Sequence, residues 1–174
     1  ENCVWKMKLT EISHDINEWF SGEGPRSDIV ISSRVRLARN LSGRKFLTRC
    51  STAEKREILD ELRDVLLGMN FGEQVHYLAV DSAPVLDRHF LVERHLISRN
   101  HAFGNGPRGA VIAESEYFTA MINEEDHLRM QVLRPGCQIR ACVDEINKID
   151  DTIEKKIAYA FSSRYGYLTA CPTN

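Results

Sequence analysis

Two arginines at alternate positions are the first candidates for chemistry in this sequence. They lie in residues 28–39, DIVISSRVRLAR, a run that predicts a strand. Alternate side chains of a strand share a face, so Arg34 and Arg36 point the same way while Val35 and Leu37 point into the core. Two guanidinium groups about 7 Å apart suit the oxygens of a polyphosphate. The spacing alone leaves open a second interpretation, a solvated strand face that carries arginines.

Three adjacent acids form the second candidate. Glu124, Glu125 and Asp126 follow an apolar segment, and Arg129 comes three residues after the last acid. Neighbouring carboxylates repel one another, so such a cluster suggests a site that holds a cation, takes up a proton or grips a guanidinium. We expect no metal site, because neighbouring side chains point in different directions. The alternative is a solvated acidic turn.

Two further residues could take part in chemistry, although each has a plainer interpretation. His95 lies near the end of a predicted helix, where a lone histidine is usually structural. Cys171 could be a nucleophile, but no Cys/His/Asn signature accompanies it, so a passive cysteine at a strand end is the default. The glycine-rich residues 103–109 do not form a P-loop, because no Lys-Ser/Thr pair follows them.

The elements that position these residues follow from periodicity and from turn-forming residues. A capping box, Ser51 with Glu54, opens a helix that stops around Gly68. Other helices are predicted over residues 9–20, 85–96 and 138–160. Strands are predicted over residues 28–39, 75–80, 109–114, 118–123, 128–133 and 165–171, with a loop over 100–109. This mixture predicts an α+β fold, an antiparallel sheet covered on one face by helices.

Composition narrows the function classes. The 174 residues are 43% hydrophobic and 28% charged with a net charge of -2, which is typical of a globular protein and argues against direct nucleic-acid binding. Apolar runs long enough for a membrane span are absent from the sequence, so we expect no membrane partner. The five cysteines are odd in number and form no CxxC pair, which favours a reduced, cytoplasmic chain.

Three motifs together resemble those of a known family. SSRVRLARN, NEEDHLR and CPTN occur in the order and at the separations found in phosphagen kinases, the ATP:guanidino phosphotransferases. WFSGEGP and ERHLIS are similar to the bacterial protein-arginine kinases within that family. The resemblance implies that residues 28–174 are the N-terminal part of a guanidino kinase catalytic domain, a glutamine synthetase-like fold, with residues 1–27 as a helix and lead-in. The family continues after CPTN into a Gly-Thr-Gly loop with another phosphate-binding arginine.

The resemblance also implies roles for individual residues. ATP would be bound by Ser32, Ser33, Arg34, Val35, Arg36, His95 and Arg129, with the arginines on phosphates and Mg²⁺ held mainly through the ATP phosphates. Glu125 would hold the substrate guanidinium, and Cys171 would tune the substrate pocket. The implied reaction transfers the γ-phosphoryl group of ATP to arginine side chains of proteins, in a cytoplasmic stress response and protein quality control. The resemblance implies arginine-containing protein substrates as partners. It also allows an activator protein, the protein degradation machinery and a second copy of the chain.

Two other functions stay open at this level. One is a non-catalytic kinase-like module that binds nucleotide or phosphoarginine. The other is a kinase of a small guanidino metabolite, although such kinases carry a whole helical domain before the arginine motif, where this sequence has only a short helix.

Overall fold

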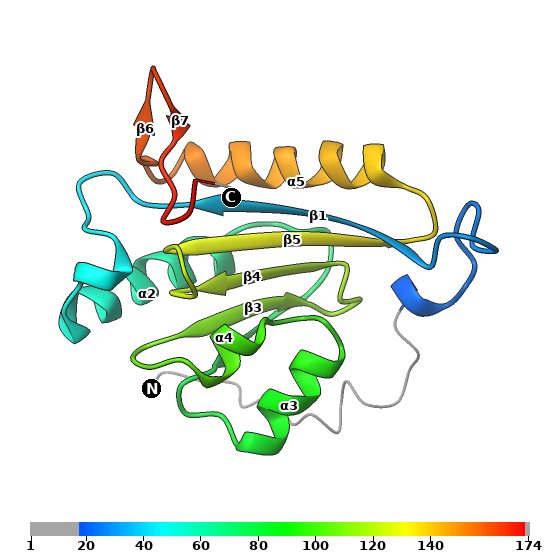
Figure 1. Cartoon of the computed structure of the whole chain (residues 1–174), viewed down its shortest axis with the longest axis horizontal. Coiled ribbons are helices and arrows are strands. Elements are labelled where there is room, and N and C mark those ends of the chain that lie inside the picture. Colours follow the sequence, from blue (N-terminus) through cyan, green and yellow to red (C-terminus); the bar gives the residue numbers. More distant parts are fainter. Residues whose placement is uncertain (1–17, 173–174) are drawn as a thin grey trace.

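Five antiparallel strands form the sheet at the centre of the structure, a computed structural model that describes residues 18–172 (Figure 1). The strand order is β1-β5-β4-β3-β2, and a separate small hairpin of β6 and β7 follows the last helix. The strands are β1 (Ser32–Arg39), β2 (Val75–Ala79), β3 (Gly109–Ala113), β4 (Phe118–Ile122), β5 (Leu128–Pro135), β6 (Phe161–Ser162) and β7 (Gly166–Tyr167).

Helices cover both faces of this sheet. The long helices α2 (Thr52–Leu67) and α5 (Ile139–Glu154) pack on one face, and the shorter α3 (Val85–Glu93) and α4 (Arg99–Phe103) pack on the other. Short 3-10 helices, η1 (Glu18–Phe20) and η2 (Leu47–Arg49), complete the described elements. The predicted α+β fold is confirmed, but the expectation of helices on one face only was wrong, because the residues around α3 and α4 bury a second apolar layer.

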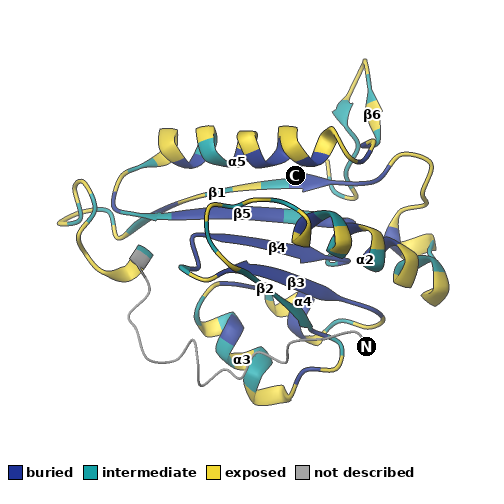
Figure 2. Cartoon of the chain, turned by 180° about the vertical axis from the view of Figure 1, so that it is seen from behind, coloured by how far each residue is buried: buried dark blue, intermediate teal, exposed yellow. Residues whose placement is uncertain are grey.

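The larger core lies between the sheet and the long helices (Figure 2). In α2, Ile58, Leu59, Leu62 and Leu66 recur at helical spacing and are fully buried. The predicted capping box begins this helix: Ser51 Oγ accepts the Glu54 N–H at 3.2 Å, and Glu54 Oε2 accepts the Ser51 N–H at 2.7 Å. The helix is therefore fixed at its start by capping and along its length by burial.

Several predicted boundaries differ from the structure. Strand β1 begins at Ser32 rather than at residue 28, because the Val30 N–H bonds back to the Arg26 carbonyl in a turn. Helix α5 ends at Glu154, and Ile157 continues its apolar pattern from a turn that enters the same core. The last predicted strand shrinks to β7, and the predicted loop over residues 100–109 begins inside α4. Most of the predicted helix over residues 9–20 lies outside the described residues.

Two glycines let the segment before β1 cross the end of β5. A Cβ on Gly24 would lie 2.2 Å from the Pro135 carbonyl group, and one on Gly136 would lie 2.4 Å from the Pro25 carbonyl oxygen. Gly136 also has a φ of +63°, a conformation that favours glycine. The close crossing holds the start of β1 at the end of β5 and so fixes their pairing. Among the described helices, none is long and apolar enough to cross a membrane.

We expect a buried histidine to make the stability of the fold depend on pH. His101 has no exposed surface, and burial lowers its pKa from 6.5 to about 4. The unfolded chain therefore takes up a proton near pH 6.5, whereas the folded chain takes it up only near pH 4. We expect stability to be full above pH 6.5 and to fall by about 3 kcal/mol toward pH 4 through this group.

Urea unfolding at pH 7.5 and at pH 5 measures this loss. His101→Gln, whose amide can still donate to the Gly109 carbonyl, should flatten the pH dependence, whereas His89→Gln, at an exposed position, should not. Equal pH dependence in native protein and His101→Gln would refute the assignment.

Candidate functional site

The register of β1 against β5 gathers the arginines on one face of the sheet. Arg34 lies opposite Leu133, Arg36 opposite Gln131, and Ala38 opposite Arg129. Residues directly opposite one another in an antiparallel pair point to the same face, so Arg34, Arg36 and Arg129 share it. This is the face covered by α3 and α4, because Met121, which pairs with Arg129, belongs to their apolar layer.

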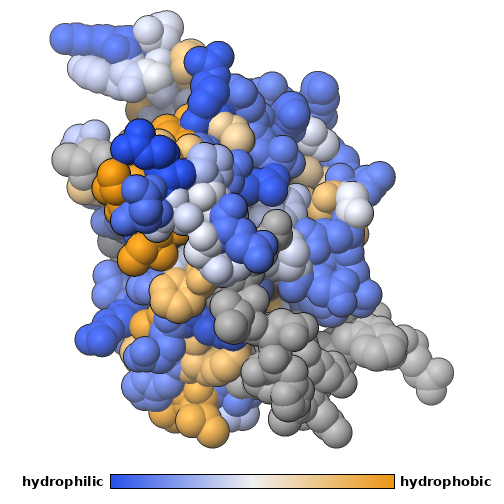
Figure 3. Space-filling view, turned by 90° about the vertical axis from the view of Figure 1, so that its right-hand side faces the viewer, coloured by the Kyte–Doolittle hydropathy of each residue, from blue (hydrophilic) through white to orange (hydrophobic). Residues whose placement is uncertain are grey.

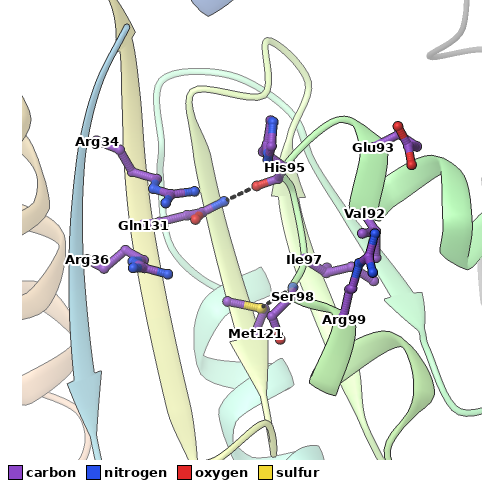
Figure 4. Close-up of a pocket in the computed structure, with 10 residues that line it drawn as sticks. All are labelled: Arg34, Arg36, Val92, Glu93, His95, Ile97, Ser98, Arg99, Met121 and Gln131. Atoms are coloured by element: carbon purple, nitrogen blue, oxygen red, sulfur yellow. Dashed lines mark hydrogen bonds between the residues drawn. The ribbon is translucent and has the colours of Figure 1, made fainter.

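An open cavity of about 380 Å³ lies between this face and the two short helices (Figure 4). Arg34 and Arg36 reach toward it from β1, and His95, Ser98 and Arg99 stand on the opposite wall. A second cavity of about 430 Å³ shares Arg34 and His95 with the first. Its other lining residues are Trp19, Phe20, Ile31, Ser32 and Leu133.

The second cavity is bordered by exposed apolar side chains. Phe20 and Ile31 are 59% and 61% exposed, and Ile29 beside them is exposed as well. Figure 3 views the molecule from the side on which the segment before β1 lies in Figure 1. It shows apolar side chains among mostly hydrophilic ones. The two cavities adjoin at Arg34 and His95, and together they offer a cationic part, with Arg34 and Arg36, and an aromatic part, with Trp19 and Phe20.

The arginines create a local excess of positive charge. Burial lowers the pKa of Arg36, and the nearby Arg34 and Arg129 lower it further, while Glu124 partly offsets them. Like charges gathered in this way repel one another unless an anion binds between them. A polyphosphate matches this arrangement, because each guanidinium can donate two parallel hydrogen bonds to phosphate oxygens.

His95 sits at a strained position of the backbone. It follows the end of α3 with a φ of +59°, where glycine is the usual residue. The Leu96 N–H bonds to the Leu91 carbonyl and the His95 N–H to the Val92 carbonyl, both at 3.0 Å, which is a Schellman ending. The predicted helix over residues 85–96 therefore ends at Glu93. A histidine at a glycine position next to a cavity suggests that the ring has a use of its own.

The three acids have different environments. The Glu124 side chain is only 3% exposed, and its carboxylate accepts hydrogen bonds from Ser98 Oγ at 2.6 Å and from Arg129 Nη1 at 3.0 Å. Burial alone would raise its pKa, but these donors leave the pKa lowered, so the group stays ionised. Asp126 is fully buried and accepts the Asn40 side-chain amide. Only Glu125 extends into solvent, with Oε2 at 3.9 Å from Arg129 Nη1.

The tight turn between β4 and β5 presents these acids. Asn123 adopts a φ of +61°, which asparagine tolerates better than most residues, and its N–H bonds to the His127 carbonyl at 2.9 Å. Its side-chain amide donates to the Lys55 and Pro107 carbonyls. The turn is thereby anchored to the first turn of α2 and to the loop before β3, and Glu125 stands at its tip.

The predicted ATP-binding residues divide between the two faces of β1. Ser32, Arg34 and Arg36 of β1 line the cavities, as does His95 after α3, whereas Arg129 is not a lining residue of either cavity and donates to Glu124. Ser33 is buried on the opposite face, where its hydroxyl donates to the Gly136 carbonyl and accepts the Gln138 N–H. Val35 packs against the larger core. Any contact of these last two residues with a ligand would have to come from their backbone.

Cys171 lies apart from the arginines along the chain but close to the acidic turn. The N–H of its neighbour Ala170 donates to Asp126 Oδ1 at 2.6 Å. The Cys171 carbonyl accepts the Thr169 hydroxyl at 2.7 Å. No disulfide joins any of the cysteines in the described part of the chain. Thr173 and Asn174, the end of the CPTN motif, lie outside the described residues.

Sequence reasoning missed Ser98, Arg99 and Gln131. Gln131 Nε2 donates to the His95 carbonyl at 2.7 Å and so fixes the strained residue (Figure 4). The period of two from Arg129 could have identified Gln131, whereas Ser98 and Arg99 depend on a helix that the glycine-rich composition concealed. Within residues 18–172, no cluster of three or more His, Cys, Asp or Glu side chains is arranged to hold a metal ion. Mg²⁺ would fit here as a partner of phosphate oxygens, which it prefers.

Comparisons with known proteins agree on one family. A family model described as "ATP:guanido phosphotransferase, C-terminal catalytic domain" matches residues 57–174. The chain is 41% identical to the protein-arginine kinase of Halothermothrix orenii over 163 residues, which are 94% of this chain and 46% of that protein. It is 40% identical to the protein-arginine kinase of Bacillus velezensis, covering 97% of this chain and 47% of that protein. The chain thus spans about half the length of these curated relatives.

Solved structures support the same fold. The duplicated taurocyamine kinase from Schistosoma mansoni, solved with bound transition state analog components, superposes with a TM-score of 0.80 at 26% identity, covering 87% of this chain and 23% of that one. Lombricine kinase superposes with a TM-score of 0.75 at 22% identity, covering 94% of this chain and 48% of that one, which speaks for the fold alone. The predicted guanidino kinase fold is confirmed.

Two substitutions at His95 distinguish the effect of its backbone conformation on stability from the effect of its ring. His95→Gly and His95→Ala both remove the imidazole, but only glycine adopts a positive φ without strain. We expect His95→Gly to be more stable than His95→Ala by about 1 kcal/mol, measured by urea unfolding. Equal stability of the two variants would show that the left-handed conformation is not present.

Proposed function

Because the chain belongs to the ATP:guanido phosphotransferase family, we propose that the protein transfers the γ-phosphoryl group of ATP to the guanidinium of arginine side chains in other proteins. The observation that carries this proposal is the arginine-lined cavity beside an exposed carboxylate. Arg34 and Arg36 supply cations for the phosphates, and Glu125 at the tip of the β4–β5 turn supplies an anion for the guanidinium.

Each group then has a task that its chemistry allows. Arg34 and Arg36 in the cavity, with Arg129 on the same face of the sheet, bind and orient the phosphates, and His95 at the border of the two cavities contacts the nucleotide. Mg²⁺, when bound to the phosphates, would neutralise part of their charge. Phosphoryl transfer is accelerated mainly by such positioning and charge neutralisation.

Glu125 addresses the weak point of the acceptor. A guanidinium is a poor nucleophile, because its lone pairs are delocalised and its pKa lies above about 12. A carboxylate at the attacking nitrogen orients it and accepts its proton as the N–P bond forms. Glu124 cannot take this role, because its side chain is almost fully covered and already bonded to Ser98 and Arg129. Asp126 is buried against Asn40 and Ala170. Glu125 is therefore the acid that we assign to the substrate, and Cys171 the residue that shapes its pocket.

The remaining parts of the proposal concern the whole protein. We assign residues 28–174 to the N-terminal part of the catalytic domain and residues 1–27 to a helix and lead-in. Arginine-containing proteins are the substrates, and the cytoplasm is the place of action. An activator protein, the degradation machinery and a second copy of the chain are the partners to test, and a stress response is the setting.

A kinase of small guanidino metabolites is the second candidate, because taurocyamine kinase and lombricine kinase share the fold. The relatives named protein-arginine kinase are 40–41% identical, whereas these two are 22–26% identical, which favours the protein substrate. Intact mass after incubation with MgATP and either a protein substrate or free arginine discriminates between the two functions.

Substitution of the β1 arginines tests nucleotide binding. Arg34→Ala and Arg36→Ala should each weaken ATP binding by about 1.5–3 kcal/mol, since each removes a charge-assisted contact. Arg140→Ala is the matched control, because that side chain is 90% exposed on α5 and pairs with Asp144. Calorimetry that finds native affinity in both β1 variants would refute the phosphate role.

The role of Glu125 is tested by Glu125→Gln in the longer protein. We expect unchanged folding and ATP affinity with a loss of phosphoarginine formation on the order of 10²-fold or more, the scale of a positioned acid–base group. Turnover is measured from the mass of the phosphorylated substrate. Near-native turnover would remove Glu125 from the mechanism and support a solvated acidic turn.

A further inference from the structure

Asp126 of the acidic turn joins distant segments of the fold, a role that its neighbour Glu125 does not share. Asp126 is fully buried, and a single oxygen, Oδ1, accepts hydrogen bonds from Asn40 Nδ2 at 2.5 Å and from the Ala170 N–H at 2.6 Å. Asn40 follows β1, and Ala170 directly precedes Cys171. One atom thus joins three segments that are far apart in the sequence.

Asn40 completes this junction. Its Nδ2 also donates to the Leu168 carbonyl at 3.1 Å, and its Oδ1 accepts the His127 N–H at 3.0 Å. The Asn40 carbonyl accepts the Ala160 N–H at 2.7 Å, and the Ala160 carbonyl accepts the Leu168 N–H at 2.8 Å. We call Asn40 and Asp126 the Asn40–Asp126 clasp, since both are buried and their polar groups face one another.

His127 fixes the turn on the side of η2. Its Nδ1 accepts the Leu41 N–H at 3.0 Å, so the ring proton is on Nε2, which donates to the Lys45 carbonyl at 2.9 Å. Burial lowers the pKa of His127, which keeps the ring neutral and this pattern intact. Buried polar groups are costly to leave without partners, so the turn cannot shift without breaking the clasp as well.

We propose that Asp126 is a positioning residue that sets the placement of Cys171 relative to Glu125. Its side chain holds the backbone of Ala170, directly before Cys171, and Glu125 is its neighbour in the chain. The meaning of this role for catalysis rests on the proposed function, in which Glu125 and Cys171 both border the guanidinium. Asp126 itself does not touch the substrate.

The first test of the role of Asp126 uses the 174-residue protein and needs no enzymatic activity. Amide hydrogen exchange at Ala170 and iodoacetamide labelling of Cys171 are followed by mass spectrometry in native protein, Asp126→Ala and Asp126→Asn. We expect Asp126→Ala to accelerate both rates by on the order of tenfold or more, because the acceptor is lost. Asp126→Asn should stay within about threefold of native, since its amide oxygen can still accept both hydrogen bonds.

Glu116→Ala is the matched control. Glu116 is also a buried acid, but it pairs with Arg94 at 2.8 Å and lies before β4, at the other end of that strand from the acidic turn. Unchanged rates in folded Asp126→Ala, or equal acceleration in Glu116→Ala, would overturn the proposal. Labelling of the fully buried Cys142 reports unfolding. If Asp126→Ala unfolds by that criterion, Asn40→Ala replaces it, and an unchanged Ala170 exchange rate there refutes the clasp.

Kinetics of the longer protein test the catalytic consequence. Asp126→Ala should lower kcat for arginine phosphorylation by on the order of tenfold and leave the KM for ATP near native, with Asp126→Asn largely restored. A native kcat in folded Asp126→Ala would refute the positioning role. If the native protein forms no phosphoarginine, the proposed function fails, and exchange and labelling alone decide whether Asp126 holds the Cys171 segment.

Discussion

Strand β1 pairs with β5 over eight residues, and this pairing decides which side chains meet at the site. A shift of one residue would turn Arg34 and Arg36 toward α5 and bring Val35 and Leu37 to the cavity. The close crossing of Gly24 and Gly136 holds the strands at one end, and the Asn40–Asp126 clasp holds them at the other. The arginine face therefore depends on contacts made at both ends of one strand pair.

Burial gives the three neighbouring acids three different roles. Glu124 offsets the positive charge of Arg129 and accepts a hydrogen bond from Ser98, the residue that caps α4. It therefore stabilises the cationic face. Asp126 joins distant segments through Asn40 and Ala170. Glu125 is at the tip of the turn, exposed to solvent and with Oε2 at 3.9 Å from Arg129 Nη1. In the proposed function, an anionic donor and a cationic acceptor meet at this turn, which is what transfer between two oppositely charged substrates needs.

Helices, strands and the faces of their side chains could be predicted from the sequence better than the hydrogen-bond partners of individual residues. Period-two spacing placed Arg34, Arg36 and Val35 on the correct faces, and the capping box placed the start of α2. The roles of Glu124 and Asp126 could not be predicted, because they depend on Ser98, Asn40 and Ala170, which lie 26 to 86 residues away. The conformation of His95 was also hidden, since a left-handed helix ending normally carries glycine. The resemblance to guanidino kinases named the site residues, but the geometry alone separated Ser33 and Val35 from the cavity-lining residues.

The most direct test of this account is the position of the phosphates in a crystal structure of the protein with a non-hydrolysable MgATP analogue. The account predicts phosphate oxygens within hydrogen-bonding distance of Arg34 and Arg36, on the face covered by α3 and α4, with His95 at the nucleotide. An analogue bound on the face of α2 and α5, or bound with both guanidinium groups turned away from its phosphates, would contradict it.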